Sequence, residues 1–405
     1  MVTESIPWAR SVSTGFRVGV GARDESSELT GASHFLEHLL FKGTDTRSAV
    51  EISDAIEGVG GDMNAVTRHE STAYFTRVPA GHLALSLDVL GEVIQSPSFR
   101  PHEVDAERQV ILEEIAMDED SYDDLVFTAL AEAMFPDHPL GREVAGTRES
   151  IAAMTRDEIA AFHAQWYVPA NIVVSVAGQV EHDEAVEAIT KRFGDLAAGI
   201  RPTRTPPVGA PKPITVLRRR SEQVHIAIGV PALSLYDEDR WAGDVAEHIL
   251  GGGTSSRLFR TIREERGLAY SVFSTVSEWS DAGQLAVYAG TAPSRWEEVL
   301  GLLQAELDRF VADGPTEAEL GLAKRYIEGG VLLSAESVGE TMAGLGRGVL
   351  HHDRVLTEEE VLEHYRAVTL ADVNRVIERV LAGARRTVAV VGPVTKKDVE
   401  RKIAS

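Results

Sequence analysis

The segment from Gly31 to Thr44 holds the residues whose types and spacing are best suited to chemistry. His34, Glu37 and His38 stand there in the order H-x-x-E-H. Histidines four residues apart lie one turn from each other on the same face of a helix. Two neutral imidazoles so placed can bind one Zn²⁺ ion, and a carboxylate beside them can act on a water at the metal. The pattern predicts a metal site; the alternative is a polar helix face with two satisfied histidines.

The residues around this motif favour the metal site. Four apolar residues surround the three ionisable ones, namely Phe35, Leu36, Leu39 and Leu40. Gly43 follows them at a position where we expect the helix to end, because glycine commonly terminates helices. Ionisable groups in an apolar helix are costly to bury, so their presence indicates a function that offsets the cost.

A catalytic zinc usually has three protein ligands, and residues 103–115 form the best candidate helix for the third. Four positions at helical spacing share the predicted apolar face of this helix: Glu107, Val110, Ile111 and Glu114. Glu113 lies about 100° away around the helix from Glu114 and should point elsewhere. We therefore expect Glu114 to be the third ligand and Glu107 to orient a ligand histidine. Without the histidine motif, a solvated acidic face would be the default interpretation.

The two motifs together resemble those of the pitrilysin/insulinase zinc metallopeptidases. H-x-x-E-H is followed about 70 residues later by E-R-x-V-I-x-x-E, and Glu114 stands at the distance from His38 that this family shows. The match is closest to the short-chain subgroup, which includes the mitochondrial processing peptidase and its bacterial relatives, and it covers nearly the whole chain. The resemblance implies a zinc-dependent endopeptidase with one Zn²⁺ per chain on His34, His38 and Glu114, and Glu37 as general base.

Composition sets broader limits on the function. The chain has 405 residues, of which 43% are apolar and 25% charged, as in soluble globular proteins with two or more domains. It has no cysteine, which excludes disulfides and thiolate metal ligands. The net charge of −23 argues against nucleic acid as a partner; it would attract basic peptides, or serve only solubility. No signal sequence or membrane-spanning segment is visible, so we expect a cytoplasmic protein with no membrane partner.

A proline-rich stretch divides the chain. Five prolines lie between residues 199 and 213, which excludes regular structure there. We predict an N-terminal zinc-binding domain over 1–199, a linker over 200–213 and a C-terminal domain over 214–405. The two halves resemble each other in three pairs of segments, which indicates an internal duplication: 16–21 with 224–229, 37–40 with 247–250, and 171–178 with 386–392.

Both halves mix strand-like and helix-like segments. We predict further strands at 74–78 and 285–289. We predict helices at 82–96, 102–118, 124–135, 155–165, 239–250, 294–312, 316–334 and 358–382. This pattern fits an α+β fold in which an antiparallel-rich sheet is covered by helices, occurring twice. The family resemblance implies two homologous α/β rolls that face each other.

The two halves of the duplication differ in the residues that could bind a metal. Asp244 stands in the second half where His34 stands in the first. Ala323 and Gly330 take the places of the two helix glutamates. We therefore expect Glu247 and His248 to bind no metal, and only the first half to bind zinc.

The family resemblance assigns two further groups of residues. In the second half Arg263 and Tyr270, seven residues apart, match a pair that contacts the substrate backbone and stabilises the oxyanion; a cation and a phenol are both suitable donors. A surface arginine and a buried strand tyrosine are the alternative. In the first half the resemblance implies that an extended peptide adds a strand near residues 61–66, at Asn64 and Ala65.

The resemblance also bears on assembly. In the processing peptidase the metal motif and the Arg/Tyr pair lie on different subunits, whereas this chain has both. We therefore expect a homodimer whose two active sites are shared between protomers and act on short or unfolded peptides. The alternatives are a non-catalytic structural subunit and a partner in a heteromeric complex that resembles the processing peptidase.

Overall fold

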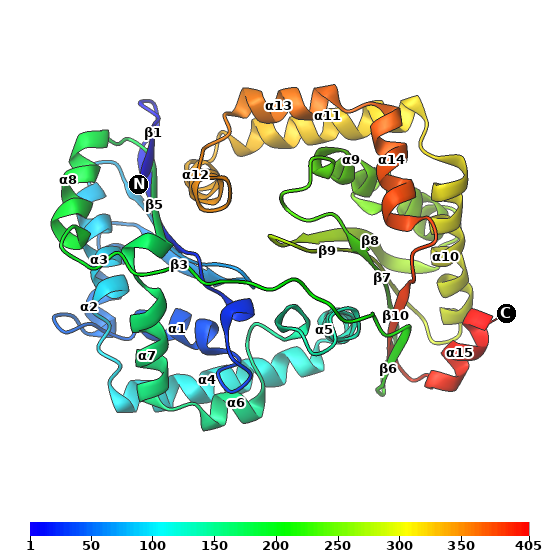
Figure 1. Ribbon diagram of the computed structural model, residues 1–405, viewed down its shortest axis with the longest axis horizontal. Helices are drawn as coiled ribbons and strands as arrows, with labels where there is room; N and C mark the ends of the chain where they lie inside the picture. The colour runs from blue at the N-terminus through cyan, green and yellow to red at the C-terminus, as the bar shows by residue number, and fades with distance from the viewer. Residues whose placement is uncertain (405) are drawn as a thin grey trace. The chain divides into compact units, whose positions relative to one another are not determined.

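Two five-stranded sheets organise residues 1–404, which a computed structural model describes (Figure 1). The first has the order β1-β5-β2-β4-β3, with β1 Val2–Ser5, β2 Ser11–Val18, β3 Asp62–Thr67, β4 Thr72–Pro79 and β5 Ile172–Gly178. The second has the order β6-β10-β7-β9-β8, with β6 Ile214–Arg218, β7 Val224–Ala232, β8 Ala269–Glu278, β9 Gly283–Thr291 and β10 Thr387–Gly392. In each sheet one outer pair is parallel and the other pairs are antiparallel. The two orders match strand for strand, which confirms the α+β class and agrees with a duplication.

The first compact unit contains residues 1–116, 142–205 and 332–358. Its helices are α1 Ala32–Leu40, α2 Ala49–Glu57, α3 Leu83–Gln95, most of α4 Pro101–Asp120, α6 Arg148–Ala153, α7 Arg156–Trp166, α8 His182–Phe193 and α12 Val338–His352. One face of the sheet packs on α1, α3, α4 and α7 in a large apolar core. The opposite face packs on α12 through a smaller apolar cluster.

The second compact unit contains residues 117–141, 206–331 and 359–405. Its helices are α5 Tyr122–Met134, α9 Arg240–Gly251, the π-helix η4 Phe259–Glu264, α10 Trp296–Asp313, most of α11 Glu317–Ser334, α13 Glu358–Ala367, α14 Leu370–Leu381 and α15 Lys396–Ala404. The large core lies between the sheet and α9, α10 and α14. The opposite face of the sheet packs on α5.

The compact units do not coincide with the two halves of the sequence, because each unit contains one segment from the other half. Helix α12 comes from the second half and covers the first sheet, while α5 comes from the first half and covers the second sheet. The linker contains neither helix nor strand, as its prolines predict. Its first part belongs to the first unit, where the side chain of Arg204 hydrogen-bonds Asp24 at 2.8 Å and the carbonyl of Thr205 accepts from Arg23 at 2.8 Å.

Three expectations about local structure are wrong. The segment 358–382 is two helices, because Thr369 caps α14 by accepting a hydrogen bond from the Asp372 backbone. Helix α1 ends at Leu40; Gly43 instead has φ +128° in a turn that pairs with Ser48. The side chain of Val110 is 43% exposed and does not belong to the buried face of α4.

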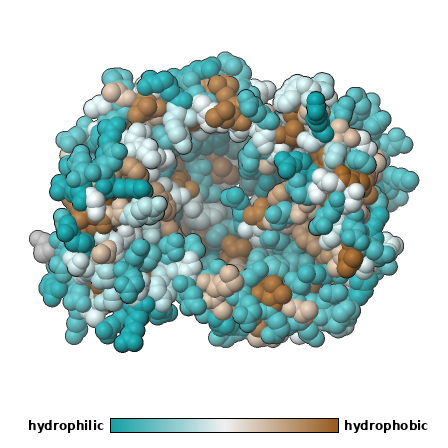
Figure 2. Space-filling view, turned by 180° about the vertical axis from the view of Figure 1, so that it is seen from behind, coloured by the Kyte–Doolittle hydropathy of each residue, from teal (hydrophilic) through white to brown (hydrophobic). Residues whose placement is uncertain are grey.

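Figure 2 shows a face on which hydrophilic residues predominate and hydrophobic residues form small, separate groups. Among residues 1–404 no helix combines the length and the apolar character that crossing a bilayer requires.

Candidate active site

Helix α1 carries the H-x-x-E-H motif and is fixed at its start by Glu25. The first backbone N–H groups of a helix have no partner within the helix. The Glu25 carboxylate accepts hydrogen bonds from the N–H groups of Gly31 and Ser33, each at 2.7 Å. Burial raises the pKa of this carboxyl to about 7, against the effect of the two backbone donors. The sequence reasoning did not identify this capping role, because Glu25 precedes the helix by several residues.

The apolar side of α1 sets its rotation. The four apolar residues of the motif are each at most 2% exposed: Phe35, Leu36, Leu39 and Leu40. Their burial, as predicted from the sequence, turns the two histidines out of the core. His34 and His38 lie with their ring centroids 4.8 Å apart, consistent with one helical turn.

Helix α4 brings a carboxylate to both histidines. Glu114 Oε2 lies 3.4 Å from His38 Nε2 and 3.8 Å from His34 Nε2. One ligand atom from each of the three residues lies within 4.8 Å of the others. Ligands at 2.0–2.1 Å from a tetrahedral zinc are about 3.3 Å from one another. The two Nε2 atoms and the glutamate oxygen therefore fit a His₂Glu zinc site of the catalytic type.

Glu107 lies behind His38, as expected for a carboxylate that orients a ligand. Its Oε2 is 3.1 Å from His38 Nδ1, and its Oε1 is 2.7 Å from Lys42 Nζ. With Nδ1–H donating to Glu107, the lone pair of Nε2 points toward Glu114. Burial lowers the pKa of His38, but Glu107, Glu114 and Glu37 outweigh it and raise that pKa. The contribution of Lys42 was not predicted; its place one turn after His38 is the signal that could have indicated it.

His34 is suited to bind a cation as a neutral imidazole. Burial, with a smaller contribution from His38, lowers its pKa to about 4, so the ring carries no proton charge at pH 7. Its Nδ1 is buried and has no hydrogen-bond partner among residues 1–404, while its Nε2 faces Glu114. A metal ligand must be deprotonated, and this environment provides that state.

Glu37 lies half-buried beside the two histidines and leaves its carboxylate available. Within residues 1–404 it forms no hydrogen bond or ion pair. The hydroxyl groups of Tyr74 and Tyr167 lie 2.8 Å apart near it. Burial and, to a smaller extent, the charge of Glu37 raise the pKa of Tyr167. The role of general base stays a prediction for Glu37. By contrast Glu113 of α4 is exposed, as expected.

Arg263 and Tyr270 come together in the second unit. The guanidinium of Arg263 donates a hydrogen bond to the Tyr270 carbonyl at 2.5 Å and lies over the Tyr270 ring, 4.5 Å from its centroid. A β-bulge between Ala269 and Ser271 contains Tyr270, whose residue surface is 80% exposed. The alternative of a buried strand tyrosine is therefore wrong. Both side chains can donate hydrogen bonds to a ligand.

Asn64 and Ala65 lie on β3, which is an edge strand of the first sheet. The side chain of Asn64 is exposed, and that of Ala65 packs partly against the core that contains α1. An edge strand presents unpaired backbone groups, so this edge can accept an added strand.

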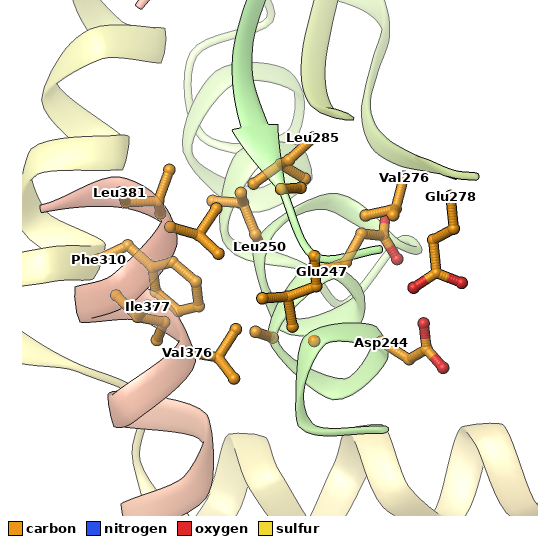
Figure 3. A pocket seen from close by; sticks show the side chains of 15 residues that line it. Asp244, Glu247, Leu250, Val276, Glu278, Leu285, Phe310, Val376, Ile377 and Leu381 are labelled. Carbon is orange, nitrogen blue, oxygen red and sulfur yellow. The ribbon is translucent and has the colours of Figure 1, made fainter. Parts of the chain in front are cut away.

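The region around α9 in the second unit brings together different residues from those of the site on α1. Figure 3 shows Asp244 and Glu247 from α9 and Glu278 from β8 at an otherwise apolar pocket, with the carboxylates of Asp244 and Glu278 turned toward each other. Burial raises the pKa of both Glu247 and Glu278 to about 7. His248 stacks on Tyr326, with ring centroids 4.2 Å apart. No His₂Glu group forms there within residues 1–404.

The geometry agrees with comparisons to known proteins. Residues 1–148 match the family model described as insulinase (peptidase family M16), and residues 153–327 match the model described as peptidase M16 inactive domain. An uncharacterized zinc protease of Mycobacterium leprae is 41% identical over all of this chain and 92% of its own length. One of Bacillus subtilis is 36% identical over 92% of this chain and 91% of its own. A crystal structure titled peptidase M16 inactive domain, from Pseudomonas fluorescens, has a TM-score of 0.91 at 21% identity and covers 97% of this chain and 96% of its own.

The fold and the His₂Glu geometry define a protein with the architecture of a metallopeptidase. The chain belongs to peptidase family M16, the insulinase family. The resemblance inferred from the two motifs is thereby confirmed. The description of the second matched region as an inactive domain agrees with the missing ligand set on α9.

Proposed function

We propose that this chain is a zinc-dependent endopeptidase that hydrolyses short or unfolded peptides. The observation that supports it most is the convergence of His34, His38 and Glu114 within 4.8 Å, with the unpartnered carboxylate of Glu37 on the same helix as the histidines. The names of the relatives, zinc proteases, agree with this class of activity.

Five residues of the first unit have separate roles in the proposed mechanism. His34, His38 and Glu114 would hold one Zn²⁺, which when bound polarises a water and the scissile carbonyl. Glu107 keeps His38 in the tautomer and orientation that binding requires. Glu37 accepts the proton of the attacking water and passes it to the leaving amine.

Arg263 and Tyr270 would supply donors to the oxygen that becomes negative during the reaction. Their guanidinium and phenol groups form one patch in the second unit, in which Tyr270 is exposed and Arg263 is partly buried. We propose a homodimer in which this pair from one protomer serves the metal site of its partner. The peptide would pair with the β3 edge at Asn64 and Ala65, which gives affinity through the backbone with little sequence preference.

A Glu37→Gln substitution tests this function. The amide keeps the size of the side chain and leaves the ligands in place, but it cannot take a proton. We expect the zinc-loaded variant to keep about one zinc per chain and to lose cleavage of an unstructured peptide by about a thousandfold or more. Cleavage by the wild type should stop with a chelator and return with zinc. Full activity in the variant would refute the role of Glu37, and zinc binding without wild-type cleavage would favour a non-catalytic subunit.

A further inference from the structure

Three arginines gather on the face of the first sheet that α12 covers. Side chains alternate along a strand. Phe16 and Val18 of β2, and Met63 and Ala65 of β3, pack in the core that contains α1. Arg17 of β2 and Arg68, which directly follows β3, therefore belong to the opposite face.

Arg347 of α12 joins the two strand arginines on this face. Helix α12 packs there on β2 and β5, and a Cβ at its residue Gly346 would lie 3.6 Å from Arg17 Nε. Burial and, to a smaller extent, the charges of Arg347 and Arg68 lower the pKa of Arg17 to about 10. The three guanidinium groups, referred to below as the arginine cluster, therefore lie within electrostatic range of one another.

The arginine cluster lacks carboxylate partners although the chain is strongly acidic. Within residues 1–404 none of Arg17, Arg68 and Arg347 forms an ion pair. Arg17 is only 9% exposed, and its side chain donates to Ser71 Oγ at 3.3 Å. Burying a cation without an anion is costly, and like charges beside it add to the cost.

The nearby carboxylates are already engaged. Glu70 pairs with Arg23 at 2.6 Å, and Asp24 pairs with Arg204 at 2.8 Å. Glu340, two turns before Arg347 on α12, acts on that arginine only at longer range. An oxyanion from outside the chain would therefore stabilise the arginine cluster.

The donors indicate which oxyanion fits. Phosphate sites commonly use backbone N–H groups at a helix start or in a nest. Arg347 lies more than two turns after the start of α12, and the N–H of Arg68 already donates to the Ser71 carbonyl at 2.8 Å. Guanidinium groups alone remain, and their planar forks match the oxygens of a carboxylate or a phosphate. Of these two groups, an unmodified peptide carries only carboxylates.

The position of the arginine cluster connects it to the peptide-binding edge. Arg68 is three residues beyond Ala65 on β3, or about 10 Å along an extended strand. A peptide that pairs with β3 and continues past Ala65 would therefore reach Arg68. Arg68 and Arg347 are both exposed, so a ligand can reach them.

We propose that Arg17, Arg68 and Arg347 form a subsite for a carboxylate of the bound peptide, from an acidic side chain or the C-terminus. This inference rests on the proposed function, because it uses β3 as the peptide-binding edge. It adds a substrate class: peptides with a negative group about three residues from the residue that pairs with Ala65. Basic residues, which the acidic net charge of the chain would attract, are then expected in other parts of the peptide.

Peptide binding tests the subsite without requiring cleavage. The zinc-loaded full chain with Glu37→Gln would be titrated against labelled unstructured peptides by fluorescence anisotropy. One peptide carries acidic residues and a free C-terminus, a second has amides at all of these positions, and two more keep only one kind of carboxylate. Arg68→Gln and Arg347→Gln would be compared with Arg10→Gln, an exposed arginine of the same unit without an ion pair.

We expect each cluster substitution to weaken binding of the acidic peptide about tenfold, and both together about a hundredfold. The cluster substitutions should not change the affinity for the amidated peptide, and Arg10→Gln should not change the affinity for either peptide. The two single-carboxylate peptides distinguish a side-chain carboxylate from the C-terminus. The substituted residues are exposed, and a thermal unfolding curve of each variant checks that it is folded.

Several results would overturn the subsite: no effect of the substitutions, an equal loss for both peptides, no peptide binding at all, or arginine-dependent binding of inorganic phosphate only. The outcome is separable from that of the proposed function. Arginine-dependent binding together with no cleavage by the zinc-loaded wild type would refute the peptidase and keep the subsite. Cleavage by the zinc-loaded wild type, together with peptide binding that does not depend on the arginines, would refute the subsite and keep the peptidase.

Discussion

Helices α1 and α9 hold matching positions in two sheets of the same strand order, yet they provide different chemical environments. Both carry a Glu-His pair, Glu37-His38 and Glu247-His248. On α1 the histidine meets two carboxylates of α4, and a lysine completes the network. On α9 the glutamate faces an apolar pocket and receives a hydrogen bond from Ser274 Oγ at 2.7 Å.

The difference shows that the sheet and its covering helices do not depend on the metal site. The second unit keeps the strand order and the buried helix while Asp244 replaces a ligand histidine and Ala323 replaces a carboxylate. Asp244 there accepts a hydrogen bond from the Tyr365 hydroxyl at 2.7 Å. A few side chains on two helices therefore decide whether this frame can bind zinc.

The largest effect is expected from removing a ligand histidine. His38→Ala should reduce bound zinc from about one per chain to none and abolish peptide cleavage, because two ligands cannot hold the metal tightly. His248→Ala should leave both unchanged, since His248 belongs to no ligand group among residues 1–404. Zinc content by mass spectrometry and a peptide-cleavage assay measure the contrast. Loss of zinc in the His248 variant would show that the second unit binds metal.

The Arg263/Tyr270 patch should affect catalysis and not metal binding. Loss of one donor to a developing oxyanion lowers kcat by about a hundredfold to a thousandfold. We expect Arg263→Ala to fall in this range, with zinc content unchanged. Arg266→Ala is the matched control, because this exposed arginine lies close in sequence and forms no ion pair within residues 1–404. Equal activity in the two variants would remove Arg263 from the mechanism.

Glu107 should affect metal affinity more than the chemistry. Loss of the carboxylate that orients a ligand histidine weakens metal binding by about tenfold to a hundredfold. Glu107→Gln should show this loss in a competition titration with a zinc chelator. Glu113→Gln on the same helix is the control, because its side chain is exposed. If both variants bind zinc as the wild type does, the contact between Glu107 and His38 has no role in affinity.

The smallest effect concerns stability in the second unit. The pKa of Glu247 is raised from 4.5 to about 7 in the folded protein, mainly by burial. Between these two values the folded state binds more protons than the unfolded state, so the free energy of unfolding falls as the pH rises. Glu247→Gln removes this loss and should stabilise the protein by about 2 kcal/mol at pH 8, allowing for partial exposure.

Denaturant unfolding at pH 5 and pH 8 measures this change. The increase in the free energy of unfolding that Glu247→Gln causes should be much smaller at pH 5 than at pH 8, because the Glu247 carboxyl of the folded wild type remains protonated at pH 5. Glu238→Gln, at an exposed residue of the same unit, is the matched control and should change the free energy of unfolding by less than about 0.5 kcal/mol. A Glu247 variant that is less stable than the wild type at pH 8 would contradict the effect of burial.

Much of the first unit's site could be predicted from sequence because helical spacing controls it. His34 and His38 are four residues apart, and Glu107 and Glu114 are seven apart, so each pair shares one face of its helix. The predicted strands likewise followed from continuous apolar segments such as 171–178. The apolar face of the helix at 103–115 suggested Glu114 as the third ligand. The family resemblance then supported a contact between α1 and α4, because periodicity alone does not fix which helices meet.

The features that escaped prediction depend on contacts distant in sequence. The arginine cluster joins residues 17, 68 and 347, and no local pattern connects them. Helices α5 and α12 cover the sheet of the other half, which only the tertiary structure shows. The break between α13 and α14 did have a local signal, since Thr369 followed by Asp372 three residues later has the spacing of a capping box.

Locating the metal would test the central claim most directly. Crystals of the zinc-loaded protein, measured at the zinc absorption edge, give the position of every bound zinc in an anomalous difference map. We expect one peak per chain, about 2.0–2.2 Å from His34 Nε2, His38 Nε2 and a carboxylate oxygen of Glu114. A peak at the Asp244, Glu247 and Glu278 pocket, or no peak between α1 and α4, would contradict the assignment of the metal site to the first unit.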